Sequence, residues 1–151
     1  MKNSLVKIWL IAAVIAFSLT GCDGEKIVTA SELPNEITTY ISTHFPHSTI
    51  LQGVVERDGF SKTYQITLSD ATKLEFNRKK EIVDIDGKNA LPNSVIPEKI
   101  LQYVCTNFPH NSVTDWKLDD RKQQVELDNE ITLEFNKDGD FLRIDDCHVL
   151  K

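Results

Sequence analysis

The chain has 151 residues, of which 40% are apolar and 26% are charged, with 6 glycines and 5 prolines. This composition excludes collagen-like and low-complexity proteins and argues against intrinsic disorder. Residues 1–21 contain two lysines and no acidic residue, so residues 22–151 hold 15 basic and 23 acidic side chains, a net charge of −8. A surface this acidic disfavours nucleic acids and anionic lipid surfaces as partners.

The N-terminal region predicts export and lipid attachment. Lys2 and Lys7 accompany an apolar run over residues 8–19, which is typical of a secretory signal and too short to span a bilayer as a helix. The run ends in Leu19-Thr20-Gly21-Cys22, which resembles the bacterial lipoprotein box. This resemblance implies cleavage before Cys22 and acylation of that residue, so that acyl chains anchor the protein in a membrane. The alternative is an ordinary signal peptide followed by an unmodified cysteine.

The rest of the chain contains an internal duplication. Residues 31–47 return 63 positions later as residues 94–110, and residues 68–77 return 59 positions later as residues 127–136. The offset changes because residues 58–61 have no counterpart in the second copy. Such repetition indicates tandem structural units. We therefore expect a lipoprotein signal peptide over residues 1–21, an acylated tether over 22–30, a first repeat over 31–92, and a second repeat with a short C-terminal tail over 93–151.

Each copy is predicted to begin with a helix. Pro34 and Pro97 suit the first turn of a helix, where the missing N–H has no partner to lose. Pro46 and Pro109 are expected to end the two helices. Between these prolines, apolar residues recur at the spacing of one helical face. They are Ile37, Tyr40, Ile41 and Phe45 in the first copy and Ile100, Tyr103, Val104 and Phe108 in the second.

Four short antiparallel strands are predicted after each helix, because apolar and polar residues then alternate with period two. The apolar face of the strands would lie under the helix, and the other face would stay open and polar. The fold class is therefore α+β, with two tandem helix-plus-four-strand repeats and both helices on one face of the sheet. The predicted strands are residues 49–56, 64–68, 74–76 and 83–85, then 113–118, 123–127, 133–135 and 142–144.

The pattern S-x-L-P-x-x-I-x-x-Y-I-x-x-x-F-P over residues 31–46, with L-E-F-N at residues 74–77 and 133–136, resembles the PepSY-like, β-lactamase-inhibitor-like family. The resemblance covers residues 31–146 in two copies. It implies a tandem-repeat fold with a curved, β-lactamase-inhibitor-like sheet, in a small exported or lipidated periplasmic protein. The family defines no catalytic residues, so the resemblance assigns none to this chain.

The open face is predicted to hold polar residues together with two apolar ones at matching positions, Ile82 and Phe141. Trp116 lies on the first strand of the second copy, and Glu134 and Arg143 flank Phe141. Large apolar side chains among charges are typical of protein-binding surfaces, so these five are candidate partner-binding residues. The alternative is that Phe141 and Trp116 pack between the repeats. The predicted open-face residues are Thr63, Gln65, Thr67, Lys73, Glu75, Ile82, Asp84, Gln124, Glu126, Thr132, Glu134, Phe141 and Arg143.

Two further pairs of residues are candidates for bonding. Cys105 and Cys147 form a candidate disulfide, because the envelope is oxidising; the alternative is two unpaired thiols. His47 and His110 follow the two helix-ending prolines and are either helix-end residues or a metal-binding or pH-sensing pair. The sequence contains neither a CxxC motif nor a glycine-turned acidic loop, so no metal site and no cofactor are predicted.

The sequence lacks the nucleophile, zinc-protease, P-loop and dinucleotide-binding motifs, so we do not expect an enzyme. The first hypothesis is a non-catalytic envelope lipoprotein that binds another protein through the open sheet face, as an inhibitor in one version. The alternative is a binder of a small ligand or a divalent cation, motivated by the acidic charge and the duplicated histidines. The expected location is the bacterial cell envelope, lipid-anchored through Cys22 on the periplasmic face or the cell surface.

Overall fold

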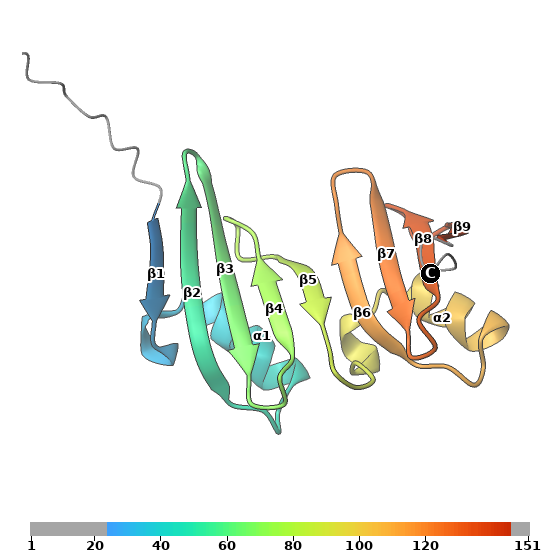
Figure 1. Cartoon of the computed structure of the whole chain (residues 1–151), viewed down its shortest axis with the longest axis horizontal. Helices are drawn as coiled ribbons and strands as arrows, with labels where there is room; N and C mark the ends of the chain where they lie inside the picture. The colour runs from blue at the N-terminus through green and yellow to red at the C-terminus, as the bar shows by residue number, and fades with distance from the viewer. Residues whose placement is uncertain (1–23, 146–151) are drawn as a thin grey trace, which may run out of the picture.

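The computed structural model describes residues 24–145, and in this range the strands form one antiparallel sheet (Figure 1). Each strand pairs with its sequence neighbours, so that β1 and β9 are the two edges. Both helices lie on the same face of the sheet, which confirms the predicted α+β class. The strands are β1 (Gly24–Val28), β2 (Ile50–Asp58), β3 (Ser61–Leu68), β4 (Lys73–Phe76), β5 (Ile82–Asp86), β6 (Val113–Leu118), β7 (Lys122–Leu127), β8 (Thr132–Asn136) and β9 (Phe141–Asp145).

The helices α1 (Asn35–His44) and α2 (Glu98–Asn107) begin and end in the same way. Pro34 and Pro97 stand directly before them, one position earlier than predicted, and each helix is preceded by a short 3-10 turn, η1 (Ala30–Glu32) or η2 (Asn93–Val95). Phe45 and Phe108 close the helices by donating their backbone N–H groups to Ile41 and Val104. The predicted apolar faces are confirmed, since the following helix residues are buried: Ile37, Ile41, Ile100 and Val104.

The helices pack on the sheet through equivalent aromatic contacts. Tyr40 of α1 meets Phe76 edge-on at a ring separation of 5.4 Å, and Tyr103 of α2 meets Phe135 in the same way at 5.4 Å. Such edge-to-face pairs favour close packing beyond the area they bury. Beneath the helices, one apolar row crosses the sheet in register. Its members are Val28, Gly53, Ile66, Leu74, Ile85, Trp116, Val125, Leu133 and Ile144.

The prediction of a tether over residues 22–30 is wrong for its central part. Residues 24–28 form β1, which pairs with β2, instead of belonging to a linker over residues 22–30. Val28 is buried there, and a Cβ at Gly53 would come within 3.0 Å of its side chain. The glycine therefore allows the close approach that holds β1 on the sheet. The predicted signal peptide, Cys22 and Cys147 lie outside the described residues.

Two β-bulges at equivalent positions change which face two predicted site residues occupy. In β5 the register passes from Glu75–Asp84 to Phe76–Ile82, which leaves Val83 as the extra residue. In β9 it passes from Glu134–Arg143 to Phe135–Phe141, which leaves Leu142 as the extra residue. A bulge interrupts the strict alternation of side chains, so Ile82 and Phe141 lie on the helix side. Their predicted position on the open face is wrong.

Candidate functional site

The face of the sheet opposite the helices carries two rows of polar side chains that cross the strands in register. We name the first the mixed row, because cations and anions share it, and the second the acidic row. The mixed row is Gln65, Glu75, Asp84, Lys117, Gln124, Glu134 and Arg143. The acidic row is Thr67, Lys73, Asp86, Asp115, Glu126, Thr132 and Asp145.

Three carboxylates of the acidic row stand directly opposite one another on neighbouring strands. Asp86 opposes Asp115 where β5 pairs with β6, and Asp115 opposes Glu126 on β7. Partial burial raises the pKa of the Asp115 carboxyl, and the charges of Glu126 and Asp86 raise it further. Like charges in directly opposed positions destabilise a sheet. Lys73 gives partial relief at one end, since its Nζ lies 3.3 Å from Asp86.

In the mixed row, an ion pair joins the two sequence copies. Lys117 Nζ of β6 lies 2.8 Å from Asp84 Oδ2 of β5, and this hydrogen bond raises the pKa of the lysine. Glu75 opposes Asp84 from the other side. Burial raises the pKa of Glu75, and the charge of Asp84 adds to the shift.

Glu134 is the centre of a bonded network at the other end of the mixed row. Its carboxylate accepts hydrogen bonds from Arg143 Nε at 2.8 Å and Gln124 Nε2 at 2.9 Å, and it also pairs with Lys122 Nζ. The residue is only 4% exposed. The hydrogen bond from Arg143, followed by that from Lys122, lowers the pKa of Glu134 to about 2. Glu134 and Arg143 both lie on the open face, as predicted, but they do not flank Phe141 there, because Phe141 lies on the helix side.

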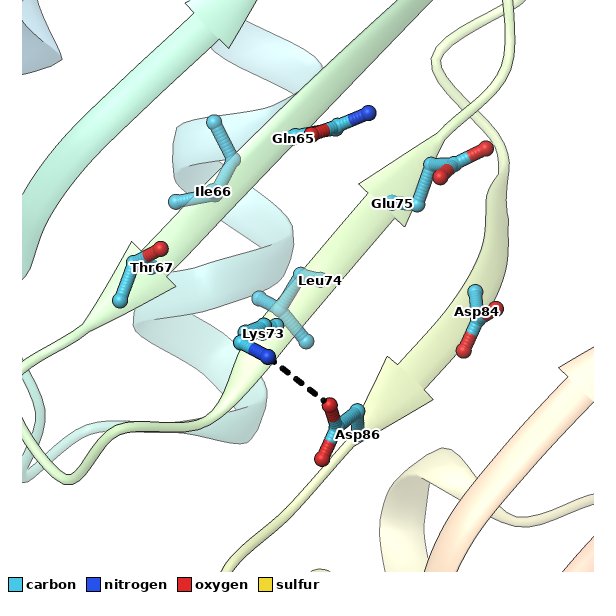
Figure 2. A pocket seen from close by; sticks show the side chains of 8 residues that line it. All are labelled: Gln65, Ile66, Thr67, Lys73, Leu74, Glu75, Asp84 and Asp86. Carbon is cyan, nitrogen blue, oxygen red and sulfur yellow. Dashed lines mark hydrogen bonds and ion pairs between the residues drawn. The ribbon is translucent and has the colours of Figure 1, made fainter.

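Both halves of this face contain a shallow hollow. The first, of about 220 Å³, lies over β3, β4 and β5. Figure 2 shows Glu75 and Asp84 at one side of it, and Lys73 bonded to Asp86 at the other. The second, of about 310 Å³, lies over β6 to β9, and Asp84 lines it as well. The first hollow is smaller than typical small-molecule pockets and the second is at the lower end of their range, so the geometry favours an extended surface over a pocket.

Three of the five predicted partner-binding residues lie on the helix side. Trp116 is 5% exposed, and its indole Nε1 donates to Gln123 Oε1 at 3.0 Å. Phe141 stacks on Tyr103 of α2 with ring centroids 4.5 Å apart, and Ile82 packs against the core. Their prediction as exposed binding residues is wrong. Trp116 instead pairs in register with Ile85 across the junction of the two copies.

Sequence reasoning missed the acidic row as a unit. It placed Lys73, Glu126 and Thr132 on the open face individually, and the structure confirms those positions. The opposition of Asp86 and Asp115 depends on the pairing of β5 with β6, which joins segments almost thirty positions apart in the chain. Period-two counting from the buried Val113 would place Asp115 on the helix side, and only the register shift between Val113 and Asp115 moves it to the open face.

Of the predicted cysteine and histidine pairs, the structure describes Cys105, His47 and His110. Cys105 is exposed on α2, and the disulfide to Cys147 stays a prediction. His47 and His110 are exposed after α1 and α2 respectively. Residues 24–145 contain no group of three His, Cys, Asp or Glu side chains placed to hold a metal ion. No helix in the same range is long and apolar enough to cross a membrane.

The family whose description is "Putative beta-lactamase-inhibitor-like, PepSY-like" matches this chain over residues 19–84 and again over residues 62–143. The chain belongs to the PepSY-like family. The two overlapping matches agree with the internal duplication of the sequence. No curated protein is significantly similar to it.

Crystal structures of three Bacteroides proteins resemble this PepSY-like chain. One, a "putative periplasmic protein" from Bacteroides vulgatus, is 31% identical with a TM-score of 0.77, and the match covers 83% of this chain and 99% of that one. A "putative calcium-regulated periplasmic protein" from Bacteroides thetaiotaomicron is 28% identical with a TM-score of 0.76, covering 80% and 96%. A second Bacteroides vulgatus protein, described as periplasmic and of unknown function, is 28% identical with a TM-score of 0.76, covering 82% and 100%. These relatives support an envelope location.

Proposed function

We propose that this PepSY-like protein is a non-catalytic envelope lipoprotein that binds a protein partner through the open face of its sheet. In this proposal the chain consists of two tandem units, α1 with β2–β5 and α2 with β6–β9, joined by the pairing of β5 with β6. The binding surface spans both units. The partner presents lysine or arginine side chains to the acidic row. In one version of the proposal, the partner is an exported enzyme that this contact inhibits.

The observation that supports a basic partner is the direct opposition of Asp86, Asp115 and Glu126 on three neighbouring strands. Each opposition lowers the stability of the free protein, because the charges repel at close range. Cations of a partner placed over the row would remove this repulsion on binding. Complementary charge of this kind accelerates association and selects partners. By contrast, Glu134 is already neutralised within the protein and is not available in the same way.

Site-specific photo-crosslinking in living cells tests the binding face. A crosslinking residue replaces Thr132 on the acidic row, and the matched control replaces Gln102, which is exposed on α2. We expect a crosslinked protein from position 132 that is absent from position 102 and is lost when Asp115→Asn and Glu126→Gln are combined. Crosslinks that are equal at both positions, or that survive the double substitution, would contradict the proposal.

Lipid attachment at Cys22 is tested separately. Cys22→Ala should move the protein from the detergent phase to the aqueous phase or leave it unprocessed, because acyl chains provide the membrane affinity. Wild-type protein that enters the aqueous phase after signal cleavage would contradict the anchor without affecting the binding face.

A divalent cation is the second candidate ligand. One structural relative is described as calcium-regulated, and calcium prefers carboxylate oxygens. The carboxylates of the acidic row would have to move closer together to hold the ion, since they form no three-residue metal group in the described structure. Thermal unfolding in calcium distinguishes the two functions, since a ligand at 100 times its dissociation constant adds roughly 2.7 kcal/mol. Stabilisation by calcium that disappears in Asp115→Asn would favour the cation, and no shift would exclude it.

A further inference from the structure

The β2–β3 turn exposes an aromatic residue at one end of the sheet. Phe60 is 95% exposed, the highest value among the large apolar residues of the described chain. It follows Gly59, whose φ of +55° allows the tight turn. The turn belongs to residues 58–61, which have no counterpart in the second copy. Because its side chain is almost fully exposed, Phe60 contributes little to the packing of the core.

Basic side chains surround this aromatic residue. Arg57 and Lys62 flank the turn, while Arg78 and Lys79 lie in the neighbouring β4–β5 turn, where Arg78 Nη1 donates to the Phe60 carbonyl at 3.5 Å. No ion pair within residues 24–145 involves any of these four. The nearby acids are Glu25, Glu56, Asp58 and Glu81, but Glu56 and Asp58 line a hollow on the open face, whereas Arg57 and Lys62 line a different hollow with Gly24 and Tyr64. The corresponding turn of the second copy instead has two adjacent acids, Asp119 and Asp120, followed by Arg121, and no aromatic residue.

The register of β1 places this turn beside the point where the chain enters the sheet. Gly24 pairs with Arg57, and Figure 1 shows the start of β1 at the same end of the sheet as the β2–β3 turn. Cys22 is two residues before Gly24, a reach of at most about 7 Å. Arg57 pairs with Lys62 and Asp58 with Ser61, so Phe60 at the tip of the hairpin lies about two residues beyond Arg57, or about 7 Å. The turn therefore projects as far from the sheet as Cys22 can.

We infer that the β2–β3 turn contacts the bilayer, with Phe60 in the interfacial layer and Arg57, Arg78 and Lys79 at the phosphates of anionic lipids. The inference rests on the proposed acylation of Cys22, because acyl chains at that residue bring the turn to the bilayer surface. Aromatic rings favour the membrane interface, and basic side chains near an anionic surface each add affinity.

This orientation also places the acidic row away from the lipid charges. Thr67, the β3 member of that row, is seven residues from Phe60, or about 23 Å along the strand. The screening length at physiological ionic strength is about 8 Å. Repulsion between the acidic row and anionic lipids is therefore screened, and the open face stays accessible to a partner. The net acidic charge of the chain does not oppose contact through this one end.

Fluorescence quenching tests the contact in the full-length protein, reconstituted into phosphatidylglycerol vesicles with brominated acyl chains. Phe60→Trp is compared with Leu51→Trp, a matched control that is 67% exposed and lies at the end of β2 far from the β2–β3 turn. After subtraction of the wild-type signal, we expect the position-60 fluorescence to lose most of its intensity and the position-51 fluorescence to keep it. Arg57→Glu with Lys79→Glu should reduce the quenching at position 60. Equal quenching at positions 60 and 51 would overturn the inference.

A second experiment distinguishes failure of the proposed acylation at Cys22 from failure of the lipid contact. Flotation of wild type and Cys22→Ala in parallel shows whether Cys22 attaches the protein to the vesicles. If wild type does not float, the anchor proposal fails, and the same two tryptophan variants are mixed with preformed brominated phosphatidylglycerol vesicles. Selective quenching at position 60 would then still support the lipid contact, and its absence would overturn it.

Discussion

Glu134 and Arg143 lie directly opposite each other on β8 and β9 and form an ion pair of 2.8 Å. At the same register position of the first copy, Glu75 on β4 opposes Asp84 on β5. The sheet thus has a neutralised carboxylate on β8 and two opposed carboxylates on β4 and β5. The pKa of Glu134 is lowered and that of Glu75 is raised, although 59 positions relate them in the repeat.

Removing the charge from these two glutamates should have opposite effects on stability. Glu134→Gln should lower the free energy of unfolding by about 2 kcal/mol, because it breaks charged hydrogen bonds around a buried group. Glu75→Gln should be neutral or stabilising by up to about 1 kcal/mol, because it relieves repulsion with Asp84. Urea denaturation at neutral pH measures both. Equal losses in the two variants would contradict the assigned environments.

The pH dependence of Glu134→Gln follows from its lowered pKa. Because the pKa of Glu134 is lower in the folded state, its carboxylate stabilises the fold at pH values above its usual pKa of 4.5. This stabilisation is lost as the pH falls toward the folded-state pKa of about 2. The stability difference between wild type and Glu134→Gln should therefore be constant above about pH 5 and disappear near pH 2. Denaturant midpoints across this range provide the measurement, and a difference that persists unchanged at pH 2 would argue against the ion pair.

Asp115→Asn should raise the stability of the protein at neutral pH, whereas Glu134→Gln should lower it. A raised folded-state pKa means that the charged carboxylate costs stability, and this cost vanishes when the pH falls below the unfolded-state value of 3.8. The free energy of unfolding of the variant should be higher than that of wild type by up to about 1 kcal/mol at neutral pH, and the two should be equal in acid. Thermal unfolding at both pH values tests this, with Asp145→Asn at the edge strand as the control. A variant less stable than wild type at neutral pH would mean that Asp115 has a stabilising partner.

Phe141→Ala should affect stability because the ring stacks on Tyr103. We expect a loss of about 2–3 kcal/mol, below the range for a fully buried phenylalanine, since the ring is only partly buried. The adjacent bulge residue Leu142, which is 53% exposed, is the control, and Leu142→Ala should cost less than about 0.5 kcal/mol. Similar losses in the two variants would contradict the position of Phe141 on the helix side.

The phenylalanines that close the two helices should contribute unequally to the free energy of unfolding. Phe45 is buried and Phe108 is only half-buried. Phe45→Ala should cost about 3–5 kcal/mol and Phe108→Ala about 2 kcal/mol. Chemical denaturation of both variants tests the order. A larger loss in Phe108→Ala would show that α2 contributes more packing energy than its burial indicates.

The sequence by itself determined the elements of this fold and its polar face. Local steric rules suffice for the helices, because Pro34 and Pro97 precede them and Pro46 and Pro109 follow their closing residues. Period-two alternation is also local, and it placed most open-face residues correctly. The family assignment needed no more than these short patterns and their repetition.

Only the tertiary structure decided which face Ile82 and Phe141 occupy and which carboxylates meet. One extra residue in a strand moves every side chain beyond it to the other face. Valine and leucine are ordinary strand residues, so the residue types at positions 83 and 142 do not predict a bulge there. The opposition of Asp86 and Asp115 likewise depends on β5 pairing with β6 in one register. Burial of Ile85 and Trp116 on the helix side favours this register, so core packing brings the two acids together on the other face.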